Sequence, residues 1–95
     1  MVTMELRRAL EAAPWRWAKS YAKTAPHWYI VRHQVPDLFN AMVDLVRAEG
    51  VSRRWKDGRT YRYLDLDGWK YWHVTGVLNR EPLPGTPRPD VEEGP

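Results

Sequence analysis

The sequence predicts an α+β domain in which an N-terminal helical arm precedes a β-α-β-β-β unit, with an antiparallel meander packed on one central helix. The 95 residues are 43% hydrophobic and 28% charged, which is typical of a globular protein. One segment has the spacing of an amphipathic helix, and two Asp-Gly pairs separate the strand-like runs that follow it. We therefore expect one domain over residues 1–80 and a Pro-rich, acidic, flexible tail over residues 81–95.

Residues 1–25 form the predicted helical arm. Residues 3–13 are good helix formers, with Thr3 as a possible N-cap and Pro14 as the stop signal. Residues 15–26 fit either a second helical stripe or an extended segment, and the sequence leaves both open.

The first strand and the central helix come next. Residues 28–32 are aromatic and β-branched and predict a strand. Residues 36–50 predict a helix that begins at Pro36 and ends at Gly50. Its apolar stripe consists of Leu38, Met42, Leu45 and Val46, widened by Phe39 and Val43.

Three further strand-like runs cover residues 51–55, 59–66 and 69–75. The Asp-Gly pairs at 57–58 and 67–68 favour the positive φ angles of tight hairpin turns, so these runs predict an antiparallel meander. Side chains alternate between the two faces of a strand. We assign six apolar side chains to the face that meets the helix: Trp28, Ile30, Leu64, Leu66, Trp72 and Val74. The opposite face then collects Tyr29, Tyr61, Tyr63, Trp69 and Tyr71, with His73 and Thr75 further along.

This second face is the candidate functional surface of a non-enzymatic module that binds nucleic acid. Aromatic rings stack on bases, and nearby cations neutralise phosphates. The residues expected to contact phosphates are Arg53, Arg54, Lys56 and Arg59, with Lys70 close by. The residues expected to stack on bases are Tyr61, Tyr63, Trp69 and Tyr71.

Two other interpretations of this face stay open. Trp15, Trp17 and Tyr21 of the arm need burial, and they can cover the face and turn it into core. Exposed aromatic and arginine side chains also form hot spots for protein partners, as in an adaptor or an inhibitor that docks on a host protein.

The distribution of charge agrees with a polyanion-facing side. The net charge is +3, but residues 1–35 carry +4, residues 36–49 carry −2, residues 50–80 carry +4 and residues 81–95 carry −3. Two basic segments thus frame an acidic helix, although a solvated basic surface gives the same pattern.

No motif indicates a metal, a cofactor or a catalytic centre. The histidines at 27, 33 and 73 lack the spacing of known ligand pairs, and the chain has no cysteine and no glycine-rich phosphate loop. We therefore expect no cofactor, no metal and no enzymatic activity. An enzyme that acts on nucleotides through His27 and Arg32 is the third hypothesis.

The same composition indicates a cytoplasmic protein. The absence of cysteine excludes a disulfide framework. The first residues lack the apolar stretch of a signal peptide, and no run of apolar residues is long enough to cross a bilayer. We expect no membrane partner.

Residues 22–32 and 58–72, with Leu-Asn-Arg at 78–80, resemble a family of small bacterial and phage proteins to which no activity is assigned. In that family, Pro-His-aromatic-Tyr and Arg precede a strand with Arg-Tyr-Tyr-Leu, then Asp-Gly-Trp-Tyr-Trp and a terminal Asn-Arg. Relatives have Thr-Met-Gly after the last Trp, where this chain has residues 73–76, His-Val-Thr-Gly. The resemblance implies a phage or mobile-element setting, and hence a nucleic-acid-binding accessory or an inhibitor of a host protein.

The polar residues of that signature suggest a small anion-binding corner. Its members would be His27, Tyr29, Arg32 and Arg80. The structural alternative is that arginines stack on Tyr or Trp rings and that His or Asn side chains hold loop backbone by hydrogen bonds.

Overall fold

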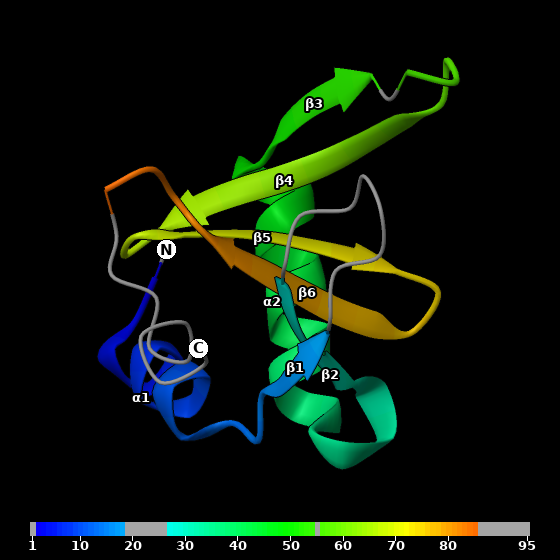
Figure 1. Ribbon diagram of the computed structural model, residues 1–95. Coiled ribbons are helices and arrows are strands. Elements are labelled where there is room, and N and C mark those ends of the chain that lie inside the picture. The colour runs from blue at the N-terminus through cyan, green and yellow to red at the C-terminus, as the bar shows by residue number, and fades with distance from the viewer. Residues whose placement is uncertain (1, 19–26, 55, 86–95) are drawn as a thin grey trace, which may run out of the picture.

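The computed structural model describes residues 2–18, 27–54 and 56–85. The elements follow one another as α1 (Met4–Ala12), β1 (Arg16–Ala18), β2 (His27–Val31), the 3₁₀ helix η1 (Arg32–Gln34), α2 (Pro36–Glu49), β3 (Val51–Arg54), β4 (Thr60–Leu66), β5 (Trp69–Val74) and β6 (Val77–Pro82) (Figure 1). The described strands form one antiparallel sheet in the order β1-β2-β6-β5-β4-β3. The predicted α+β class, with a meander on a central helix, is confirmed.

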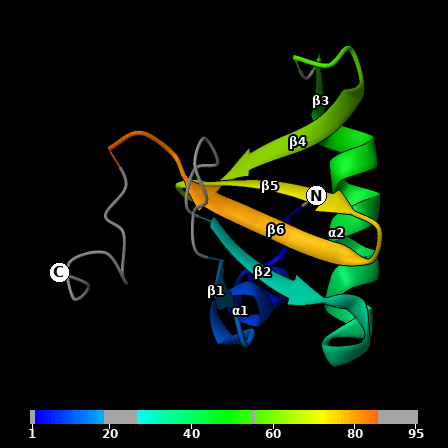
Figure 2. The ribbon, with the colours of Figure 1, turned by 45° about the vertical axis from the view of Figure 1, so that its right-hand side comes forward.

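Helix α2 lies along one face of the sheet (Figure 2), and the strands cross in front of it in the view of Figure 1. Leu10 of α1 packs into the same core as Phe39 and Met42 of α2 and Tyr71 of β5, so both helices lie on this side of the sheet. We call it the helix face. No helix in the described residues is long and apolar enough to cross a membrane.

Within residues 2–18, the N-terminal segment is helical only over Met4–Ala12. The Thr3 hydroxyl accepts a hydrogen bond of 3.1 Å from the Leu6 amide and caps α1 as predicted. After Pro14 the chain extends into β1, where Trp17 lies opposite Trp28 of β2. The extended alternative therefore holds for Arg16–Ala18, whereas residues 19–26 lie outside the described residues.

Helix α2 has the predicted stripe and the predicted end. Its buried residues are Leu38, Phe39, Met42, Leu45 and Val46. The Gly50 amide donates to the Val46 carbonyl over 2.9 Å, and a Cβ at Gly50 would lie 2.8 Å from the Tyr63 carbonyl oxygen. The chain needs glycine here because a Cβ would clash first with the Val46 carbonyl oxygen of α2 and also with the backbone of β4.

Strand β6 corrects the predicted end of the domain. Val74 lies opposite Val77, and Thr75 and Gly76 between them have φ angles of +44° and +77°, as in a type I′ turn. The strand continues through Glu81 and Pro82, so these two residues belong to the sheet and not to the predicted tail. The turn lacks the usual Asn-Gly signal, which is why the sequence did not reveal the strand. Residues 86–95 lie outside the described part of the chain.

The predicted faces of β5 are inverted. Asp67 and Gly68 form a two-residue turn, so Leu66 lies opposite Trp69, and Leu64 lies opposite Tyr71. Directly opposed residues point to the same face. Trp69, Tyr71 and His73 therefore share the helix face, while Trp72 and Val74 point away from the helices.

Candidate nucleic-acid interface

The face opposite both helices carries a cluster of aromatic rings around one lysine. We call Tyr61, Tyr63, Lys70 and Trp72 the aromatic face. The Lys70 ammonium lies 5.3 Å from the ring centroid of Tyr61, 4.8 Å from that of Tyr63 and 6.0 Å from that of Trp72. It donates a hydrogen bond of 3.0 Å to the Tyr61 hydroxyl and lies 3.7 Å from a carboxylate oxygen of Glu81.

These contacts hold the rings in place without covering them fully. The Lys70 side chain is only 17% exposed, whereas Tyr61, Tyr63 and Trp72 are half-buried. The ring centroids of Tyr61 and Tyr63 lie 5.9 Å apart, and the ring of His27 lies 5.8 Å from that of Trp72. The result is a row of flat side chains across strands β4, β5 and β2.

A basic hairpin borders this row at the edge of the sheet. Arg53 lies opposite Tyr61 and therefore shares the aromatic face, and Arg54 beside it points to the other face. Arg53, Arg54, Lys56 and Arg59 are all exposed.

Arg59 has a structural partner inside the turn. Its side chain binds the Asp57 carboxylate at 2.7 and 2.8 Å, and its amide donates to the same carboxyl group over 3.0 Å. These hydrogen bonds lower the pKa of Asp57 below its usual value. Arg59 therefore stabilises the turn of the hairpin through its contacts with Asp57.

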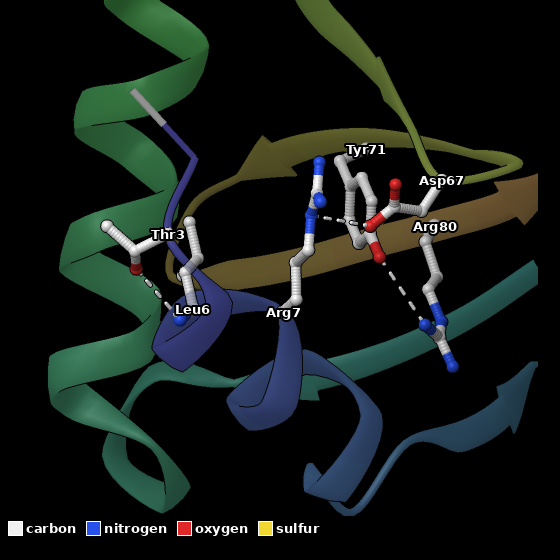
Figure 3. Close-up of polar contacts among 6 residues, drawn as sticks. All are labelled: Thr3, Leu6, Arg7, Asp67, Tyr71 and Arg80. Carbon is white, nitrogen blue, oxygen red and sulfur yellow. Dashed lines mark hydrogen bonds and ion pairs between the residues drawn. The ribbon is translucent and has the colours of Figure 1, made fainter.

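Trp69 and Tyr71 do not belong to this surface. Tyr71 is 2% exposed in the core, and burial raises the pKa of its hydroxyl. Its hydroxyl accepts a hydrogen bond of 3.4 Å from Arg80 (Figure 3). Their predicted stacking role fails for the reason that inverts β5: the two-residue turn places them beside Leu64 and Leu66.

Arg80 is enclosed by aromatic rings on the helix face. Its guanidinium carbon lies 4.1 Å from the ring centroid of Trp15 and 3.8 Å from that of Trp69. Beside it, Arg7 of α1 pairs with Asp67 over 3.1 Å (Figure 3). Such stacking agrees with the structural alternative proposed from the sequence for this arginine.

The structure does not assemble the predicted anion corner. Trp28 and not Tyr29 lies opposite Arg80, so Arg80 is on the helix face and His27 and Tyr29 are on the other. Arg32 follows β2 and stacks on Phe39 of α2, with 4.9 Å between the guanidinium carbon and the ring centroid. The four residues therefore occupy three separate places.

The alternation in the sequence predicts Trp72 in the core and Lys70 only as a flanking cation, and the structure places both on the aromatic face. The two-residue length of the Asp67-Gly68 turn was the signal that could have placed both correctly, because it determines which residues of β4 and β5 lie opposite each other.

Among the described residues, no group of three or more His, Asp or Glu side chains is placed to hold a metal ion. Comparisons with protein-family models, with curated proteins and with solved structures found no match. The resemblance to small bacterial and phage proteins stays a prediction.

Proposed function

We propose that the protein is a non-enzymatic module that binds single-stranded nucleic acid on its aromatic face. The observation that carries this proposal is the cluster of Tyr61, Tyr63 and Trp72 around Lys70, on the sheet face opposite both described helices. Stacking of a base on an aromatic side chain contributes roughly 1–3 kcal/mol, and it tolerates any base sequence.

The neighbouring charges suit a phosphate backbone. Arg53, Arg54 and Lys56 are exposed, and none has an ion-pair partner among the described residues. Arg53 lies beside Tyr61, so a strand whose bases stack on the rings would pass its phosphates along the β3-β4 hairpin. Lys70 adds a cation between the rings themselves.

A protein partner is the second candidate. Val51 is 56% exposed and Val74 is 51% exposed, and both belong to the same face as the aromatic cluster. Exposed apolar side chains around aromatic anchors are typical of protein interfaces. In this case the protein would act as an adaptor or inhibitor.

Salt dependence separates the two candidates. Fluorescent single-stranded oligonucleotides should bind at about 50 mM salt and bind progressively more weakly as salt is raised, because phosphate contacts release counterions. Arg53→Gln should weaken binding, whereas Arg8→Gln removes one exposed charge from α1 on the helix face and should have a smaller effect. The absence of oligonucleotide binding at low salt would exclude the nucleic-acid function and leave the protein partner.

A further inference from the structure

A polar pocket lies on the helix face, at the opposite side of the sheet from the proposed nucleic-acid interface. Its volume is about 510 Å³, and it is formed by η1, α2 and the turn between β5 and β6. The polar side chains that line it are Arg32, Asn40, Asp44, Arg47, His73 and Thr75. The proposed function makes no use of this pocket.

The pocket lining includes two arginines, Arg32 and Arg47, and neither forms an ion pair among the described residues. Arg32 is held in place by its stacking on Phe39. Asp44 lines the same pocket. With His73 neutral, the lining carries one more positive than negative charge.

Thr75 of the pocket lining has an unfavourable backbone conformation. Its φ of +44° is in the left-handed region, which a β-branched residue rarely adopts. Asn or Gly would form this turn at lower cost. Unlike glycine, threonine adds a hydroxyl to the residues that line the pocket. Residues with strained backbone conformations are frequent at ligand sites.

His73 supplies a further polar group to the pocket lining. Its ring meets the Phe39 ring nearly edge to face, with 6.3 Å between centroids. Burial lowers the pKa of His73, and the nearby Arg47 lowers it further. An anion bound beside it would favour the protonated ring and oppose both effects.

We propose that this pocket binds the phosphate group of a phosphate monoester. Arg32 and Arg47 supply the charge, and Asn40, His73 and Thr75 supply hydrogen-bond donors. Two arginines with several neutral donors fit a doubly charged tetrahedral group better than a single carboxylate. The ligand site is separate from the aromatic face, so it does not depend on nucleic-acid binding there.

Inorganic phosphate tests the proposal. We expect the ring resonances of His73 to shift in nuclear magnetic resonance spectra as phosphate is added, with half-saturation at about 1 mM, and the pKa of His73 to rise when phosphate is present. Arg47→Gln and Arg32→Gln should each weaken phosphate binding by about tenfold, because each removes a charge-assisted hydrogen bond.

Two further variants separate a site from general attraction to a basic protein. Thr75→Gly relieves the backbone strain and removes the hydroxyl, so it should preserve the fold and weaken phosphate binding. Arg8→Gln removes an equal charge from α1 and should leave phosphate binding unchanged. The proposal is wrong if phosphate leaves the His73 resonances unmoved, or if Arg8→Gln weakens binding as much as Arg47→Gln. Oligonucleotide titrations of the same variants report on the other face separately.

Discussion

Arg62 of β4 joins the sheet to the C-terminal end of α2. Its guanidinium donates to the carbonyl oxygens of Arg47 and Gly50 over 3.1 and 2.7 Å, and to the Ser52 hydroxyl over 3.0 Å. A weaker contact of 3.4 Å reaches the Val46 carbonyl. The last carbonyls of a helix have no partner within the helix, so one planar side chain satisfies several of them and adds favourable charge at the negative end of the helix dipole.

Replacing Arg62 by lysine should therefore destabilise the fold although charge is kept. A lysine ammonium lacks the planar set of N–H donors of a guanidinium and cannot contact all of these acceptors at once. We expect the free energy of unfolding to fall by about 1 kcal/mol, which urea denaturation can measure. Arg54→Lys, on the neighbouring exposed strand, should leave it nearly unchanged. Equal effects of both substitutions would show that the Arg62 contacts contribute nothing specific.

His73 makes the stability of the fold depend on pH. Its pKa in the folded protein is lowered below the usual 6.5 by burial and by Arg47, while Arg32 and Asp44 line the same pocket. The unfolded chain therefore binds a proton at a higher pH than the folded chain does. The contribution of the neutral ring is fully present above about pH 6.5 and is lost as the pH falls through the lowered value.

The variant His73→Gln should consequently lose less stability between about pH 7 and pH 5 than the unmodified protein does. Thermal melts across this range measure the difference. His33→Gln provides the control because His33 is exposed. A pH profile of His73→Gln parallel to that of the unmodified protein would contradict the assignment.

At the scale of elements, the β3-β4 hairpin concentrates positive charge at one end of the sheet. Arg53 and Arg54 lie next to each other on the edge strand, and neither forms an ion pair with Asp44 or Glu49 of α2. Among the basic side chains that the structure describes in this hairpin, Arg59 is the one with an ion-pair partner, Asp57. Arg53, Arg54 and Lys56 place like charges close together at one end of the sheet, and their mutual repulsion costs stability that a purely structural hairpin would avoid.

Replacing Arg53 and Arg54 together with glutamine should preserve or raise the melting temperature. The same change should weaken oligonucleotide binding. It should also reduce the slope of the logarithm of the binding constant against the logarithm of salt concentration by roughly two, because two phosphate contacts are lost. Calorimetry and fluorescence titration measure the two effects. A lower melting temperature with unchanged binding would mean that the arginines serve the fold and not a ligand.

At the scale of the whole molecule, local patterns predicted most of the elements. The stripe of α2, the stop at Gly50 and the Asp67-Gly68 turn all depend on neighbours in sequence, and the structure contains them. The predicted tight turn at Asp57-Gly58 is wrong, because Arg54 pairs with Thr60 and of Asp57 and Gly58 only the glycine has a positive φ. Strand β6 was missed because its Thr-Gly turn is an uncommon solution for a type I′ hairpin.

The candidate surface was harder to predict than the fold. The face on which a side chain lies depends on whether the preceding turn has an odd or an even number of residues. A register of β5 shifted by one residue relative to β4 therefore predicted Trp69 and Tyr71 on the wrong face of the sheet. The enclosure of Arg80 brings Trp15 from the N-terminal segment against β5 and β6, and no local pattern encodes such a contact.

The position of β6 between β5 and β2 also has a kinetic consequence. Strands β3 to β6 pair with their neighbours through short turns, so the meander can form early, whereas the pairing of Ile30 with Leu78 must close a loop of about half the chain. We therefore expect docking of β2 to be a late step in folding. Substitutions at the Asp67-Gly68 turn should mainly slow folding, while substitutions such as Ile30→Val should mainly speed unfolding.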